Sequence, residues 1–114
     1  REFLNANNGG IDLFPNEFNI SQNYPNPFNS QTSLNISLMD NAIIDIDIYN
    51  LLGEKVVSLA KQENRPAGFY TFIWDGKDEF GNILSSGVYL AAGRIADLKG
   101  NSLKIQNRKM VLVK

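Results

Sequence analysis

The sequence predicts an all-β domain, a seven-stranded antiparallel β-sandwich of immunoglobulin-like type. Apolar and polar residues alternate in most segments after residue 17, the pattern of half-buried strands. Turn signals rich in glycine, proline and asparagine separate these segments at intervals of about 8–12 residues, which is typical of sandwiches. No segment shows the period of an amphipathic helix, so strands account for the whole fold.

The first four strands follow from this alternation. Residues 18–20 predict a short first strand, residues 32–38 a second and residues 44–49 a third. Leu51–Glu54 predicts a hairpin, because Gly53 can take the positive φ of a tight turn. The fourth strand is expected over residues 55–60.

The second half continues the pattern after a break. A polar loop is expected over residues 61–68, because Pro66 disfavours a central strand. The fifth strand is expected over residues 69–74, with aromatic side chains on both faces. A sixth is expected over 87–95 and the last over 103–113.

The organisation is that of one domain behind a connector. Residues 1–16 include Asn-Ala-Asn-Asn-Gly-Gly, and this composition predicts a linker from an upstream domain. Residues 17–114 form the β-sandwich. No apolar run approaches the ~18 residues of a membrane-spanning helix, so no transmembrane segment is expected.

Composition argues against catalysis. The chain contains no cysteine and no histidine, which removes disulfides, thiolate nucleophiles, Cys/His zinc sites and imidazole bases. We therefore expect a non-catalytic protein without a cofactor.

The charges are unevenly distributed. Residues 99–114 hold five basic side chains and no acid, whereas residues 1–98 hold six basic and twelve acidic side chains. Lysines on a final edge strand discourage pairing with the wrong partner. The basic segment is not interleaved with aromatic residues, so nucleic acid is not an expected partner.

Two acidic groups are candidate sites. Asp45 and Asp47 share one strand face, a spacing compatible with a carboxylate pair, but their alternation with isoleucines favours a solvated face. The loop from Asp75 to Asn82 contains oxygen ligands suited to calcium. Its spacing differs from the known calcium-loop pattern, and Asx-turns at Asp75 and Asn82 are the preferred interpretation. A weak metal candidate remains, formed by Asp75, Asp78 and Asn82.

Aromatic residues offer a third candidate. Trp74, Tyr70 and Tyr89 could stack on sugars if they were exposed. Burial in the core is the preferred interpretation, because aromatic burial stabilises a small sandwich most.

The segment Tyr24-Pro25-Asn26-Pro27-Phe28-Asn29 predicts a stiff lid. The prolines fix their own φ angles, and the two asparagine side chains can satisfy nearby backbone groups. Tyr24 and Phe28 are expected to anchor the lid over one open end of the core.

Six motifs occur in a fixed order along the chain. They are Asn23-Tyr24-Pro25-Asn26-Pro27-Phe28-Asn29, Ile48-Tyr49-Asn50-Leu51-Leu52-Gly53, Ala67-Gly68-Phe69-Tyr70, Trp74-Asp75-Gly76-Lys77-Asp78 with Gly81, Ser86-Gly87-Val88-Tyr89, and Lys109-Met110-Val111-Leu112-Val113-Lys114. This ordered set resembles a known family, the C-terminal sorting domains of type IX secretion substrates, which are related to the immunoglobulin-like domain of flagellar hook-capping proteins. The resemblance spans about residues 17–114.

The resemblance implies a function. Such domains direct an upstream cargo through the periplasm and outer membrane of Bacteroidetes-like bacteria to the cell surface or medium. Their partners are the outer-membrane type IX translocon and a sortase-like cysteine protease, whose cut would fall within residues 1–16. By analogy, recognition by the translocon is expected at Gly68, Tyr70, Gly87, Tyr89, Lys109, Met110, Val111, Leu112, Val113 and Lys114.

A further expectation concerns the final strand. Lys109–Lys114 could be read through its charge and by β-augmentation, in which a partner strand joins a free sheet edge. Two other functions are compatible with the sequence: an accessory glycan-binding module, or a structural module that assembles with like domains.

Overall fold

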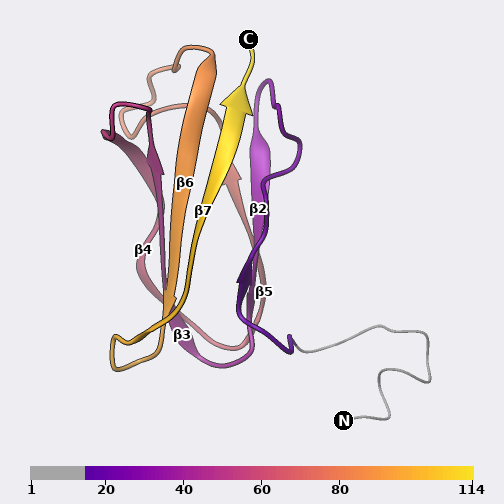
Figure 1. Ribbon diagram of the computed structural model, residues 1–114, viewed down its shortest axis with the longest axis vertical. Coiled ribbons are helices and arrows are strands. Elements are labelled where there is room, and N and C mark those ends of the chain that lie inside the picture. Colours follow the sequence, from indigo (N-terminus) through magenta and orange to yellow (C-terminus); the bar gives the residue numbers. More distant parts are fainter. Residues whose placement is uncertain (1–14) are drawn as a thin grey trace, which may run out of the picture.

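The computed structural model describes residues 15–114, which form two antiparallel sheets packed face to face (Figure 1). The fold class predicted from the sequence is confirmed. One sheet has the order β1-β2-β5 and the other β4-β3-β6-β7. The strands are β1 (Asn19–Ile20), β2 (Thr32–Leu38), β3 (Ala42–Tyr49), β4 (Lys55–Arg65), β5 (Gly68–Trp74), β6 (Gly87–Ala96) and β7 (Ser102–Leu112). The predicted linker, residues 1–16, lies almost entirely outside the described residues.

The core lies between the sheets and comes directly from the alternation. In β2 and β3 every second residue is buried, including Leu34, Ile36, Ile44 and Ile46, each at most 1% exposed. Burying one such side chain stabilises the fold by about 1.5–3 kcal/mol relative to leaving it exposed. The intervening positions face outward, as a two-residue period requires.

The expected loop over residues 61–68 was wrong for its first part, because β4 continues to Arg65. The strand continues through a bulge: Ile44 pairs with Glu63 and Ile46 with Ala60, so β4 has one extra residue there. Gln62 takes a positive φ of 48°, and its backbone N–H donates to Asp45 Oδ1 at 2.9 Å. The carboxylate therefore supports the bulge, which residue propensities alone did not reveal.

β1 fits closely against β6. A Cβ placed on Gly93 of β6 would lie 2.6 Å from Ile20 Cδ1, closer than two non-bonded carbon atoms approach in proteins. Ile20 itself is 1% exposed. The short first strand is thus held by a glycine that makes room for its one buried side chain.

Candidate functional site: the lid and the closing strand

The lid lies along the outer edge of β7, near the C-terminus (Figure 1). Asn26 holds two successive groups of that edge: its Oδ1 accepts from Val111 N at 2.9 Å and its Nδ2 donates to Lys109 O at 3.2 Å. Gln22 Nε2 also donates to Lys109 O, at 2.9 Å. The side-chain amides of Asn26 and Gln22 therefore replace a neighbouring strand.

Backbone pairing completes this contact. Phe28 N donates to Val111 O at 2.9 Å, and Val113 N donates to Phe28 O at 2.8 Å, which forms a parallel bridge at Phe28. Asn29 Nδ2 donates to Val113 O at 3.1 Å. The edge of the closing strand, expected from the sequence to be free for β-augmentation, is already occupied by the chain's own lid.

One of the two expected anchors is correct. Phe28 is 2% exposed. The centre of its ring lies 5.4 Å from the ring centre of Trp74, and the ring centres of Trp74 and Tyr89 lie 5.3 Å apart. Tyr24 is 80% exposed and anchors nothing in the core, so its expected role as an anchor was wrong. Its backbone pairs with Ser33 instead.

Buried polar groups fix the start of the lid. The side chains of Asn23 and Thr32 are almost fully buried and joined by a hydrogen bond of 3.0 Å. Both donate to the carbonyl oxygen of Pro25, at 3.2 and 2.7 Å. Each of these two buried polar side chains therefore has a partner, which is the condition for burying it without a large cost. The peptide bonds preceding Pro25 and Pro27 are cis.

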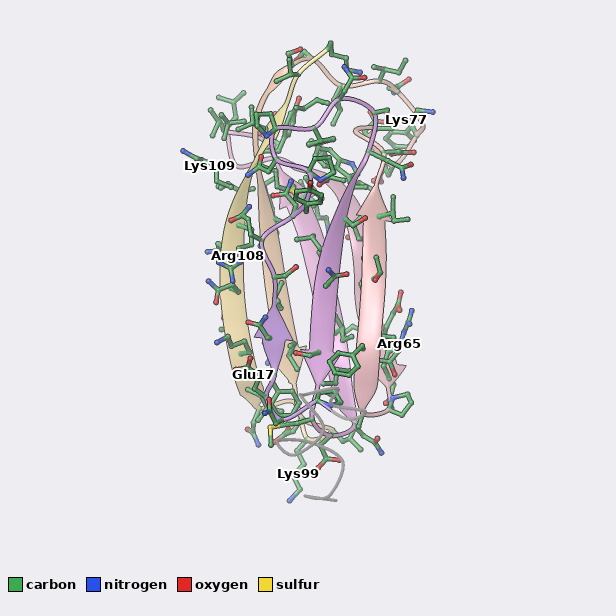
Figure 2. All side chains as sticks on the ribbon, turned by 90° about the vertical axis from the view of Figure 1, so that its right-hand side faces the viewer. Glu17, Arg65, Lys77, Lys99, Arg108 and Lys109 are labelled. Carbon is green, nitrogen blue, oxygen red and sulfur yellow. The ribbon has the colours of Figure 1, made fainter. Side chains whose placement is uncertain are left out.

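A second, polar anchor lies lower on the same edge. The guanidinium of Arg108 in β7 donates two hydrogen bonds to the carbonyl oxygen of Ile20, at 3.1 and 2.8 Å. Figure 2 shows Arg108 and Lys109 on the β7 side of the molecule. Arg108 thus joins the two sheets directly, a role that the sequence did not predict.

The two Gly-x-Tyr motifs have the same local structure. Tyr70 donates its hydroxyl to Pro66 O at 2.6 Å, and Tyr89 donates to Ser85 O at 2.7 Å. In each case the tyrosine bonds to a residue four positions earlier, as in the tyrosine corner of immunoglobulin-like sandwiches. Gly68 and Gly87 begin the strands that carry these tyrosines. These residues shape the loops at the strand starts.

The loop from Asp75 to Asn82 is stabilised by aspartate side chains that accept hydrogen bonds from nearby backbone N–H groups. Asp75 Oδ1 accepts from Lys77 N at 3.1 Å, while Asp78 Oδ1 accepts from Phe80 N and Asn82 N, both at 2.9 Å. The predicted Asx-turn is confirmed at Asp75, but the second one centres on Asp78 instead of Asn82. Gly76 and Gly81 have φ angles of 73° and 84°, as their turns require.

The same five-residue turn occurs three times within residues 15–114. In Asn50–Glu54, Asp78–Asn82 and Asp97–Asn101, the first side chain accepts from the backbone N–H groups two and four positions later. A glycine at the fourth position donates its N–H to the first residue's carbonyl. The pattern Asn/Asp-x-x-Gly-Asn/Glu could have been found in the sequence.

These hydrogen bonds lower the pKa of two carboxyl groups, those of Asp78 and Asp97. Desolvation would raise the pKa of Asp78, but hydrogen bonds from the amides of Asn82 and from Phe80 N lower it below its ordinary value. The pKa of Asp97 is lowered mainly by the backbone N–H of Asn101. Across residues 15–114, no group of three or more acidic side chains is placed to hold a metal ion.

Two of the three aromatic residues that could have stacked on sugars are buried in the core. Trp74 is 1% exposed, Tyr89 is 6% exposed, and the indole N–H of Trp74 donates to Lys77 O at 3.0 Å. An exposed sugar-stacking platform centred on Trp74 does not form. The carboxylates of Asp45 and Asp47 lie half-buried on the outer face and bond to β4, Asp45 at Gln62 and Asp47 at Ser58.

The closing motif has a buried and an exposed side. Met110 and Leu112 are at most 1% exposed and belong to the core, whereas Lys109, Val113 and Lys114 are exposed. Lys114 N donates to Ser86 Oγ at 2.9 Å. The terminal residue is therefore held against the loop that precedes β6.

Comparison with protein families gives a match to the model described as the secretion system C-terminal sorting domain, over residues 22–70. The resemblance to sorting domains is confirmed. The match begins two residues before the lid and ends at Tyr70, the first tyrosine corner. A comparison with curated proteins gave no match.

Solved structures share the fold. Dimeric latent PorU from Porphyromonas gingivalis aligns with a TM-score of 0.65 and 19% identity, over 91% of this chain and 10% of that one. FlgD from P. aeruginosa aligns with a TM-score of 0.56 and 19% identity, over 89% of this chain and 78% of that one. PorZ, described as a bacterial surface component of the type IX secretion system of P. gingivalis, aligns with a TM-score of 0.50 and 18% identity, over 83% and 11%.

These likenesses concern the sandwich alone. The chain spans about a tenth of PorU and of PorZ. The sorting-domain match supports a role as a type IX secretion signal. Within residues 15–114 there is no helix long and apolar enough to cross a membrane.

Proposed function

We propose that this domain is a non-catalytic C-terminal signal that directs an upstream cargo across the outer membrane by type IX secretion. The observation that carries the proposal is the sorting-domain match over residues 22–70. The lid contacts support it, because the matched segment is hydrogen-bonded to β7, which lies outside the match. The two ends of the domain therefore form one surface.

This composite surface is the part of the domain that we assign to the translocon. It presents Tyr24, Pro25 and Asn26 from the lid, together with Lys109 and Lys114 from the closing motif, all of them exposed. A partner that reads both segments at once would bind only a chain whose last strand has docked. The signal would thus report that the domain is folded.

Five of the remaining expected recognition residues have another role under this proposal. Met110, Leu112 and Tyr89 are buried, so a partner cannot reach their side chains without unfolding the domain. Gly68 and Tyr70 form the first tyrosine corner. These residues preserve the shape of the signal, while the exposed basic side chains supply its charge.

Removal and attachment of the cargo complete the proposal. The family resemblance implies that a sortase-like cysteine protease cuts upstream of the sandwich, within residues 1–16, and that the released cargo is attached to the cell surface or freed. The Asn- and Gly-rich composition of residues 5–10 suits such a connector. The glycan-binding alternative has no support from Trp74, whose ring is enclosed.

The test uses a fluorescent reporter fused to the whole chain in a bacterium with an active type IX pathway. Deleting the closing motif would remove Met110 and Leu112 from the core, and loss of export would then reflect unfolding. The sharper variant is Lys109→Ala with Lys114→Ala. Its matched control is Lys61→Ala with Lys99→Ala, which removes the same charge from exposed positions elsewhere.

The pattern of export among these fusions distinguishes the sorting role from the assigned surface. We expect export of the unmodified fusion and the control, and intracellular or periplasmic retention of the Lys109/Lys114 variant with an unchanged melting temperature. Export of all fusions would remove the assigned surface and leave the sorting role standing. Retention of every fusion, with the domain folded, would overturn the sorting role.

A further inference from the structure

The outer edge of β5 is the least protected sheet edge in residues 15–114. The two sheets end in four edge strands, β1 and β5 in one, β4 and β7 in the other. An unpaired edge presents N–H and C=O groups that can pair with another chain. Proteins protect such edges with charged residues, bulges, short strands or a covering segment.

Three of these edges carry such protection. β1 is two residues long. The lid covers the C-terminal part of β7, and Lys104 lies in its remaining part. β4 has the bulge at Gln62 and carries charged side chains along its length, namely Lys55, Lys61, Glu63 and Arg65.

β5 has none of these features. Its sequence, Gly-Phe-Tyr-Thr-Phe-Ile-Trp, contains no charge and no proline. It pairs with β2 without a register shift over all seven residues, and β2 is the one strand that pairs with it within residues 15–114. Its outer face exposes two large apolar side chains, Phe69 at 60% and Ile73 at 54%.

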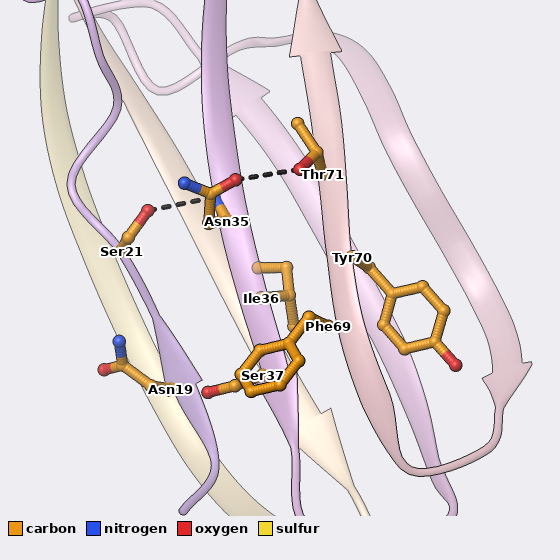
Figure 3. Close-up of a pocket in the computed structure, with 8 residues that line it drawn as sticks. All are labelled: Asn19, Ser21, Asn35, Ile36, Ser37, Phe69, Tyr70 and Thr71. Atoms are coloured by element: carbon orange, nitrogen blue, oxygen red, sulfur yellow. Dashed lines mark hydrogen bonds between the residues drawn. The ribbon is translucent and has the colours of Figure 1, made fainter. Parts of the chain in front are cut away.

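The exposed residues are arranged symmetrically about Thr71. Phe69 and Ile73 lie two positions before and after it, on the same face, because side chains alternate along a strand. Figure 3 shows Phe69 and Thr71 on the outer face of the β1-β2-β5 sheet, with Tyr70 directed away from them. A strand with this pattern matches its own antiparallel copy.

We propose that β5 pairs antiparallel with β5 of a second copy of this chain, with a two-fold axis at Thr71. In this register Phe69 lies opposite Ile73 of the second copy, and Thr71 lies opposite Thr71. Aromatic with β-branched, and Thr with Thr, are favourable cross-strand pairs. The contact is isologous, as in most homodimers, and it joins two three-stranded sheets into one.

The second face of the strand is compatible with this pairing. Tyr70 would lie opposite Phe72 of the second copy, on the core side. A charged group that contacts this face is Arg65, whose guanidinium carbon lies 4.9 Å from the Tyr70 ring centre and 5.2 Å from that of Phe72. Glu63 pairs with it at 2.6 Å. The edge therefore brings no uncompensated like charges together.

Alternative registers satisfy the pattern less well. A shift by two residues leaves Phe69 or Ile73 without a partner and shortens the paired segment. A shift by one residue would place outer-face residues opposite core-facing ones. The inference does not rest on the sorting role, because it uses only the edge of β5.

Sedimentation equilibrium of the whole chain from ~10 µM to ~1 mM tests the proposal, because weak interfaces fall in this range. We expect a reversible monomer–dimer equilibrium. Thr71→Lys and Thr71→Glu each place like charges opposite each other at the axis. Each should raise the dissociation constant at least ~10-fold, since opposed like charges cost several kcal/mol.

An equimolar mixture of the two variants provides the decisive measurement. We expect heterodimers to form, because opposite charges then meet at the axis. Ile105→Lys, at an exposed position of β7, is the matched control and should leave the equilibrium unchanged. A chain that remains monomeric throughout the range, or a dimer that Ile105→Lys disrupts and Thr71→Lys does not, would overturn the proposal.

Discussion

Asn26 and Val111 are 85 positions apart, and the side-chain oxygen of the first accepts the backbone N–H of the second at 2.9 Å. The amide nitrogen of the same side chain donates to Lys109 O at 3.2 Å. One asparagine of the lid therefore binds a donor and an acceptor on the edge of the closing strand. This contact explains why a polar segment lies between β1 and β2.

Replacing Asn26 should destabilise the sandwich. Asn26→Ala removes both hydrogen bonds, and we expect a loss of about 1–2 kcal/mol in the free energy of unfolding, because each is an exposed bond worth about 0.5–1.5 kcal/mol. Urea unfolding followed by the fluorescence of Trp74 measures this. Asn64→Ala, at an exposed position of β4, is the control. Equal stability of both variants would contradict the lid's role.

The close approach of Gly93 to Ile20 gives a second prediction. Gly93→Ala should cost about 1–3 kcal/mol, as overpacking does in other cores, because its Cβ would meet Ile20 Cδ1 at 2.6 Å. Ile20→Val removes that methyl group. In the double variant we therefore expect the cost of Gly93→Ala to fall, which a double-mutant cycle of urea unfolding detects. Additive effects would show that another contact is responsible.

Phe28 should be the most sensitive lid residue. Phe28→Ala leaves a cavity beside Trp74, whose ring lies 5.4 Å away, and such truncations cost about 3–5 kcal/mol. The tryptophan emission of the variant should shift to longer wavelength as water gains access. Tyr24→Ala, in the same lid but 80% exposed, should change stability by less than about 0.5 kcal/mol. If Tyr24→Ala lowered the free energy of unfolding as much as Phe28→Ala, the prediction would be wrong.

Acid should destabilise the domain through Asp78 and Asp97. The pKa of each is lowered in the folded protein from the ordinary value of 3.8, so the folded state binds protons more weakly than the unfolded state. This stabilisation is present above pH 3.8 and is lost as the pH falls through the folded-state pKa.

Asparagine substitution isolates that contribution. Asn50 accepts the same pair of backbone N–H groups in the equivalent turn, so Asp78→Asn with Asp97→Asn should keep both turns. We expect a shallower decline of the melting temperature below pH 4 than in the unmodified chain. Parallel declines would mean that other carboxylates control acid unfolding.

The residue pattern alone determined where most of the strands lie and which of their faces are buried. Alternation at Leu34, Ile36, Ile44 and Ile46 decided which side chains are buried, because a strand turns every second residue to the same face. The Asn/Asp-x-x-Gly turns are equally local, since their hydrogen bonds link residues at most four positions apart. The motifs that indicate the sorting-domain family are also short segments of sequence, so they could be read without knowing the contacts between them.

Tertiary structure decided what lies against what. The length of β4 depended on Asp45, a residue of the neighbouring strand that supports the bulge at Gln62. The occupied edge of β7 and the open edge of β5 depended on which segments come together in space. The sequence carries no local signal for such contacts, because Asn26 would satisfy its amide equally well with water until Val111 is placed beside it.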